Sequence, residues 1–206
     1  MAAVTYNTGN FANSSYAPAY LPVLWGVSKA PGTALHTSTT ATNILPSSAN
    51  FCFTSVGYGK IFPAGTLNNL GNFFTLECEG TIGTTSTPNL TLAVTMTDSA
   101  STPVVATLAT SSAVAMQAIT GVRPWSLRAT FGCIATGGTA TLRGIGRFDY
   151  DTAALSGGFG LVSTAGVDCA LTLANEVKLV ATWGTSSASN TITCTAARIY
   201  VGITNG

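Results

Sequence analysis

The chain of 206 residues is poor in charge: Asp, Glu, Lys and Arg together make up 7% of it, against roughly a quarter of an average soluble domain. Eight basic and seven acidic residues leave a formal net charge of +1. No basic run is present, so electrostatic attraction to nucleic acid is not supported. The mean hydropathy is +0.40, yet no charge-free apolar run reaches about 18 residues, and no transmembrane helix or membrane partner is expected.

Histidine and paired cysteines are also scarce. His36 is the one histidine; it stands among threonines without a cysteine or acidic neighbour, which favours a hydrogen-bonded edge residue over a general base. The start of the chain shows no basic and apolar regions typical of a secretory signal. The cysteines are odd in number, form no C-x-x-C pair and suit small buried hydrophobes, so no metal site or cofactor is expected: Cys52, Cys78, Cys133, Cys169 and Cys194.

Two carboxylate pairs are candidate catalytic groups. Glu77 and Glu79 share one strand face, and Asp149 and Asp151 would do so if their strand persists. Glycoside hydrolysis needs two carboxylates about 5 to 10 Å apart in a cleft, with perturbed pKa values. A solvated face and a turn are the favoured interpretations, so the chain is not expected to be an enzyme.

Alternation of apolar and polar residues is the abundant signal, and it predicts half-buried strands. Leu90 to Met96 give the cleanest example, and Trp125 to Cys133 follow the same pattern. Gly137-Gly138 predicts a hairpin turn, whereas 149–174 is the least regular part. Eight to ten strands with few or no helices indicate an all-β sandwich, jelly roll or barrel.

The last thirty residues are predicted to form a terminal hairpin. Val177 to Trp183 alternate, a small polar loop follows at 184–190, and Ile192, Cys194 and Ala196 alternate again. The phase then slips by one residue near Ala196-Ala197, which predicts a β-bulge.

Residues 1–32 are predicted to form an extended N-terminal arm, followed by one domain at 33–206. Pro18 and Pro22 exclude a regular helix or a central strand. Such an arm either covers an edge of its own domain or reaches a neighbouring subunit. Trp25 is the chief candidate for an intersubunit contact because Trp buries a large area at interfaces. The other candidate interface residues are Tyr20, Leu21 and Leu24 in the arm, and Arg143 and Arg147. The two arginines share a strand face; they are either ordinary residues of its polar side or bridges to acidic groups of a neighbouring subunit.

Several segments resemble the jelly-roll capsid decoration, or cement, proteins of tailed bacteriophages. The most specific is Trp183-Gly184 followed by Ser-Asn-Thr-Ile-Thr, and the others are 61–67, 79–92 and 124–130. The resemblance covers roughly Thr33 to the C-terminus, and the region before Thr33 departs from it. It implies a two-sheet antiparallel jelly roll, usually a homotrimer, on the outer capsid surface of a virion assembled in the host cytoplasm. The implied partners are further copies of the chain and the major capsid protein.

The alternative is a receptor-binding or fibre-tip module that recognises cell-surface glycans through loops at one end. No heptads or fibre repeats precede Thr33, which favours the cement interpretation. A carbohydrate-active enzyme is the weakest alternative, since it would need clustered carboxylates in a groove.

Overall fold

The computed structural model describes residues 23–36, 38–53, 60–152, 156–163 and 165–203. These residues form fifteen strands and one 3-10 turn at Ser48–Asn50, without an α-helix. The strands are β1 (Val23–Ser28), β2 (Leu35–His36), β3 (Thr42–Asn43), β4 (Phe51–Phe53), β5 (Ile61–Phe62), β6 (Phe73–Thr84), β7 (Asn89–Asp98), β8 (Val105–Thr110), β9 (Val114–Ala115), β10 (Ile119–Ala135), β11 (Ala140–Asp151), β12 (Ser156–Val162), β13 (Val167–Cys169), β14 (Asn175–Trp183) and β15 (Thr191–Gly202).

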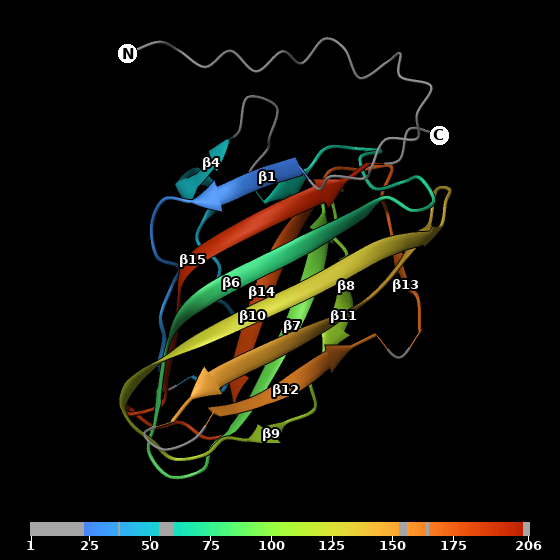
Figure 1. The fold of residues 1–206 in the computed structure, drawn as a ribbon. Coiled ribbons are helices and arrows are strands. Elements are labelled where there is room, and N and C mark those ends of the chain that lie inside the picture. Colours follow the sequence, from blue (N-terminus) through green and yellow to red (C-terminus); the bar gives the residue numbers. More distant parts are fainter. Residues whose placement is uncertain (1–22, 37, 54–59, 153–155, 164, 204–206) are drawn as a thin grey trace, which may run out of the picture.

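Every strand pairing is antiparallel, and the strands form one curled sheet in the order β3-β14-β7-β8-β12-β11-β10-β6-β15-β1-β4. In Figure 1 the strands β12, β11, β10, β6 and β15 form the front layer, and β14, β7 and β8 cross behind it. The layers join where β12 meets β8 through a single pair, Val162 opposite Thr110. The predicted all-β class is confirmed.

The core lies between the two layers and is built from the alternating residues that the sequence indicates. Leu90, Leu92, Val94 and Met96 of β7 are fully buried, and Trp183 of β14 is too. Burial of such side chains stabilises the fold by about 1.5–3 kcal/mol each. The predicted hairpin around Gly137-Gly138 is confirmed by the pairing of β10 with β11.

The predicted terminal hairpin is wrong, although both of its strands exist. β14 pairs with β7, β3 and β5, whereas β15 pairs with β6, β1 and β2. The two strands belong to different layers, and packed sheets lie about 10 Å apart. The seven residues 184–190 therefore connect the layers instead of closing a hairpin. The predicted bulge is confirmed, with the register of β15 shifting between Cys194 and Ala196.

The predicted arm extends too far along the chain. Val23–Ser28 is strand β1, which pairs with β15 on one side and β4 on the other. The prediction that this segment lacks regular pairing is therefore wrong for Val23 to Val27, which pair within their own domain, as the first of the two interpretations of the arm expects. Both prolines that suggested it, Pro18 and Pro22, precede the first residue of β1 in the sequence. Residues 1–22 lie outside the described residues.

Strand β12 lies within 149–174, the part that the sequence marks as least regular. It pairs with β11 in continuous register from Ser156 opposite Asp151 to Val162 opposite Ile145. Its glycines at 157, 158 and 160 carry no side chain, so no alternation of apolar and polar residues marks the strand in the sequence. No helix in the described part of the chain has the length and apolar character needed to cross a membrane.

Candidate binding surfaces

The predicted arm contacts are only partly described by the structure. Tyr20 and Leu21 lie outside the described residues. Leu24 is half-buried in β1, and the register with β15 shifts between Leu24 and Gly26, so Trp25 lies at an irregular point of the ladder. The side chain of Trp25 is outside the described part of the chain, so its contact with a neighbouring subunit stays a prediction.

The two predicted arginines lie together but far from β1. Arg143 and Arg147 both point outward from β11, with the exposed Ile145 between them. Strands β10, β6 and β15 separate β11 from β1. Arg147 forms an ion pair within its own strand, with Nε 2.8 Å from Oδ1 of Asp149. The structure therefore does not join the arm and the arginines into one site.

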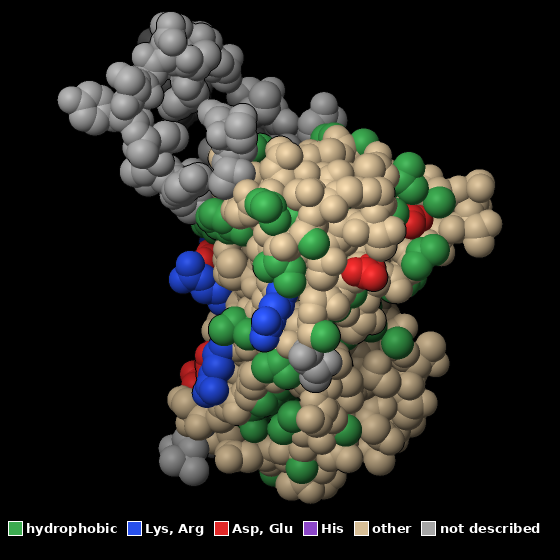
Figure 2. All heavy atoms as spheres, turned by 90° about the vertical axis from the view of Figure 1, so that its right-hand side faces the viewer, with side chains coloured by type: hydrophobic (Ala, Val, Ile, Leu, Met, Phe, Trp, Pro, Cys, Tyr) green, Lys and Arg blue, Asp and Glu red, His purple; other side chains and the backbone are tan. Residues whose placement is uncertain are grey.

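A cross-strand row of charges runs over the outer face of the front layer. Arg147, Arg128, Glu77 and Arg198 lie opposite one another on β11, β10, β6 and β15. With Arg143, four of the five arginines of the chain are on this surface, which we call the arginine face. Figure 2 shows basic side chains, with acidic ones beside them, along its left side, which is the front of Figure 1.

The carboxylates of the arginine face are held by its arginines. Arg128 Nε lies 3.4 Å from Glu77 Oε1, and Arg198 Nη2 lies 3.2 Å from Glu79 Oε1. These exposed pairs contribute roughly 0–1 kcal/mol each to stability. Glu77 and Glu79 thus lie on a salt-linked open face, as the solvated-face interpretation expects.

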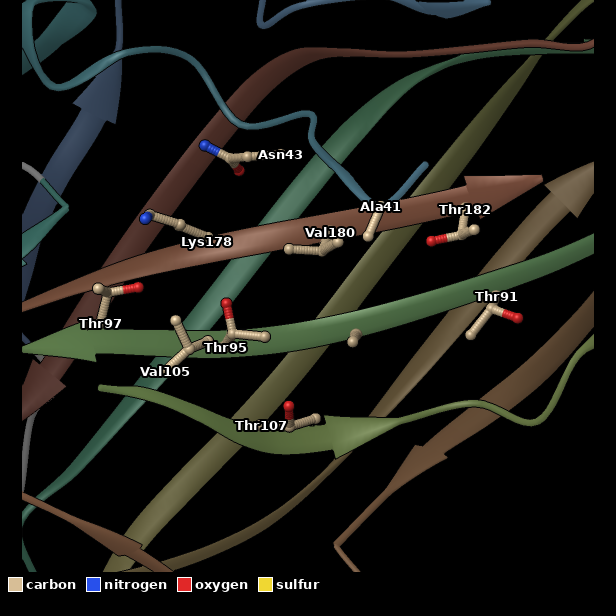
Figure 3. Close-up of a pocket in the computed structure, with 11 residues that line it drawn as sticks. Ala41, Asn43, Thr91, Thr95, Thr97, Val105, Thr107, Lys178, Val180 and Thr182 are labelled. Atoms are coloured by element: carbon tan, nitrogen blue, oxygen red, sulfur yellow. The ribbon is translucent and has the colours of Figure 1, made fainter. Parts of the chain in front are cut away.

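The outer face of the back layer carries a hollow of about 430 Å³. Thr107 of β8, Thr95 of β7 and Lys178 of β14 lie opposite one another across it. Figure 3 shows Thr95 between Thr107 and Lys178, on neighbouring strands. We call this surface the threonine hollow. Its lining residues are Ala41, Asn43, Thr91, Ala93, Thr95, Thr97, Val105, Thr107, Lys178, Val180 and Thr182.

Two hydroxyl groups of the threonine hollow are buried without a hydrogen-bond partner. The Oγ1 atoms of Thr95 and Thr97 form no hydrogen bond with any described residue. Thr95 is only 6% exposed. An unsatisfied buried polar group costs about 1–3 kcal/mol, so each such group in a folded protein calls for an explanation. A bound polar partner that reaches these hydroxyls would remove that cost.

Charge is nearly absent from the threonine hollow. Lys178 is its one charged lining residue, and its Nζ lies 3.5 Å from Oε2 of Glu176. The hollow therefore suits a neutral polar partner, such as the main chain of another protein or a sugar, better than an ion.

A second hollow of about 500 Å³ lies beside the arginine face, and acidic residues line part of it. Its three carboxylates are already engaged: Glu79 by Arg198, Asp149 by Arg147, and Asp151 Oδ1 by the Ser156 hydroxyl at 2.8 Å. Trp125 also lines this hollow but is buried, and its Nε1 donates to the main-chain oxygens of Thr81 and Thr193. Asp149 and Asp151 belong to β11, so the expected turn at these residues is wrong.

Four of the cysteines are free and buried: Cys78, Cys133, Cys169 and Cys194. Burial, with the neighbouring Asp168 and Cys133, raises the pKa of the Cys169 thiol to about 12. Burial and the adjacent Cys194 raise the pKa of Cys78. Among the described residues, no group of three or more His, Cys, Asp or Glu side chains is placed to hold a metal ion.

The threonine hollow was missed by sequence reasoning. Threonines at 91, 95 and 97 were recognised only as the solvated side of a strand. The alternation in the sequence shows that these threonines share one face of β7. That they line a hollow follows only from the pairing of β7 with β14 and β8.

Comparison of the chain with protein-family models, with curated proteins and with solved structures finds no match.

Proposed function

We propose that the chain is an adhesive structural protein of a bacteriophage virion, a decoration or cement protein that binds the outer capsid surface and stabilises the head. The resemblance of its strand segments to that family supports the proposal, as does the confirmed antiparallel all-β class. In this proposal the two layers are the sheets of a jelly-roll sandwich. The residues before β1 serve as an arm, and the chain acts as a homotrimer.

The threonine hollow is the observation that carries the binding role. Thr95 and Thr97 hold two buried hydroxyls that have no hydrogen-bond partner among the described residues, in a nearly uncharged surface. A main-chain segment of the major capsid protein offers both N–H donors and C=O acceptors, and hydroxyls can pair with either. Contacts of this kind depend little on salt, because few charges are involved. Three such hollows in a trimer would multiply a modest affinity.

The test is co-sedimentation of the purified protein with capsids stripped of their decoration. Binding at a fixed, saturable copy number is the expected result. Protein that remains in the supernatant at all concentrations would contradict the proposal.

Glycan recognition is the second candidate function, and the same hollow favours it. Its neutral hydroxyl lining and its volume of about 430 Å³ suit one or two sugar rings as well as a peptide segment. A glycan array distinguishes the two candidates, since only a receptor-binding module retains a defined sugar.

A further inference from the structure

Strand β12 has an edge that the other described strands leave largely open. On one side it pairs with β11 along its whole length, and on the other only Val162 meets β8. The main-chain N–H of Ser163 donates to Gly144 O of β11. Because these groups alternate along an antiparallel strand, those of Ser156, Gly158 and Gly160 point away from β11. In the described part of the chain, these outward groups have no strand beside them.

The open edge of β12 lacks the features that normally prevent sheets from joining. Proteins protect exposed edges with lysine, proline, bulges or very short strands. Residues Ser156–Val162 contain no charge and no proline, and their register with β11 shows no shift. Gly158 and Gly160 are exposed and carry no side chain on the outer face of the sheet. Another strand can therefore approach without a steric obstacle from β12.

A charge pair lies over this edge. Arg147 is opposite Gly160, and Asp149 is opposite Gly158. A Cβ atom placed on Gly158 would clash with the Asp149 carboxylate and lie 2.8 Å from Nη2 of Arg147. The Arg147–Asp149 ion pair therefore covers Gly158 and reaches β12 from the neighbouring strand.

We propose that β12 is a self-association edge: two copies of the chain join their β12 strands antiparallel about a two-fold axis at Phe159, which extends the sheet across both molecules. In this register Gly158 exchanges hydrogen bonds with Gly160 of the partner subunit, and Gly160 with the partner's Gly158. These two pairs give four main-chain hydrogen bonds.

The charge pairs disfavour one neighbouring register. With the axis at Phe159, the Arg147–Asp149 pair over Gly158 and its copy over the partner's Gly158 cover diagonal neighbours, which are about 7–8 Å apart. An axis at Gly158 would set the two copies of Gly158, and the Asp149 carboxylates above them, directly opposite each other, and like charges in that position are unfavourable.

The contact is two-fold and is separate from the proposed capsid binding and from a three-fold association. A monomer should therefore double in mass through this contact, and a trimer, which carries three such edges, should at least double. Because the test is made in solution without capsids, its failure leaves the proposed function untouched, and failure of capsid binding leaves this contact untouched.

The experiment is sedimentation velocity of the full chain over a wide range of concentrations. We expect a mass-doubling step that Gly160→Pro abolishes, because proline removes the outward N–H without removing a bond to β11. Gly160→Ala is the matched control: its Cβ meets only Gly146 O, at 3.8 Å, so doubling is retained. Arg147→Glu should lose the step, and the swap Arg147→Glu with Asp149→Arg should restore it.

A measurement on the unaltered chain keeps the proposal testable if Gly160→Pro fails to fold. Hydrogen exchange at the amides of Gly158 and Gly160 should slow as the concentration rises, whereas exchange at Ser163 should stay constant. A constant mass at every concentration, undiminished doubling by folded Gly160→Pro, or fast exchange of both glycine amides at all concentrations would overturn the proposal.

Discussion

The Nζ atom of Lys60 lies 2.9 Å from Oε1 of Glu176, and the Lys60 side chain is only 3% exposed. This pair connects the segment before β5 to the start of β14, next to the hydrogen bond from Val177 N to Lys60 O. Ser48 also donates its hydroxyl to Oε1 of Glu176. The Glu176 carboxylate on β14 therefore connects that strand to two other parts of the chain, at Ser48 and at Lys60.

Removal of the Glu176 charge should destabilise the fold because Lys60 would stay buried without a counter-charge. Glu176→Gln is expected to lower the free energy of unfolding by about 2–3 kcal/mol, less than for a fully buried pair because Glu176 is partly exposed. Lys178→Met removes the second partner of the same carboxylate, which is only partly buried and lies 3.5 Å away, and should cost less than about 1 kcal/mol. Chemical denaturation of both variants tests this order, and equal costs would contradict it.

The same pair predicts a dependence of stability on pH. Burial alone would raise the pKa of Glu176, but the hydrogen bond and charge of Lys60, with Ser48 and Lys178, outweigh burial and lower it. A lowered folded-state pKa gives stability that is complete above the unfolded value of about 4.3 and is lost as the pH falls through the folded value. Acid titration of the unfolding free energy should show this loss, and Lys60→Met with Glu176→Gln should reduce it.

The two core tryptophans should respond differently to the same substitution. Trp125 Nε1 donates to Thr81 O at 3.0 Å and to Thr193 O at 3.1 Å, so it connects β10 with β6 and β15. Trp183 Nε1 is buried without a partner among the described residues. Both changes to Phe remove the same volume, but only Trp125→Phe leaves two carbonyls without their donor. Trp125→Phe should therefore lower the free energy of unfolding by about 1–3 kcal/mol more than Trp183→Phe does. Chemical denaturation followed by circular dichroism measures both losses, and equal losses would contradict this account.

The buried thiols should be unreactive in the folded protein. With a pKa of about 12, Cys169 carries almost no thiolate near pH 8, and the thiolate is the nucleophile. Iodoacetamide should therefore leave Cys78, Cys133 and Cys169 unmodified until denaturant is added, as read by peptide mass spectrometry. Rapid modification of any of the three in the native protein would contradict the described burial.

The position of β1 decides where the chain can be shortened. A chain that begins at Val23 keeps β1 between β15 and β4 and should fold with nearly unchanged stability. A chain that begins at Thr33 loses β1, exposes an edge of β15 and should unfold at a lower denaturant concentration. Equal unfolding midpoints for the two chains would show that β1 adds nothing to the sheet. Only the chain beginning at Val23 can test the role of residues 1–22 in binding.

The sequence predicts strands well where side chains alternate in size and polarity, and poorly where they do not. Residues Leu90 to Met96 predict β7, because each buried residue alternates with a polar or small one. Strand β12 is hard to predict, because three of its seven residues are glycines, which add no polar side chain to the pattern. Strand β1 was not predicted because Pro18 and Pro22 stand just before it. The sequence alone does not show that the strand begins directly after Pro22.

Strand partners were the other part that the sequence could not supply. The loop 184–190 is as compatible with a crossing between layers as with a hairpin, because sequence proximity alone does not fix pairing. The threonine hollow depends on the same information. Thr95 and Lys178 are far apart in the sequence and meet only through the register of β7 with β14.

The central claim is that the hydroxyl groups of Thr95 and Thr97 lower the stability of the fold and serve to bind a partner. Replacement of each by valine nearly conserves the shape of the side chain and exchanges only the hydroxyl for a methyl group. We expect Thr95→Val with Thr97→Val to raise the free energy of unfolding by about 1–3 kcal/mol for each hydroxyl replaced, because two unsatisfied groups leave the interior. The same double variant should bind stripped capsids more weakly.

The most direct measurement is therefore co-sedimentation of stripped capsids with the unaltered chain and with Thr95→Val/Thr97→Val at matched concentrations. Thr75→Val serves as the control, because Thr75 is buried on β6 and its hydroxyl already pairs with Thr130 at 2.9 Å. The account predicts saturable binding of the unaltered chain and of the control, and reduced binding of the more stable double variant. Full binding by the double variant would contradict it.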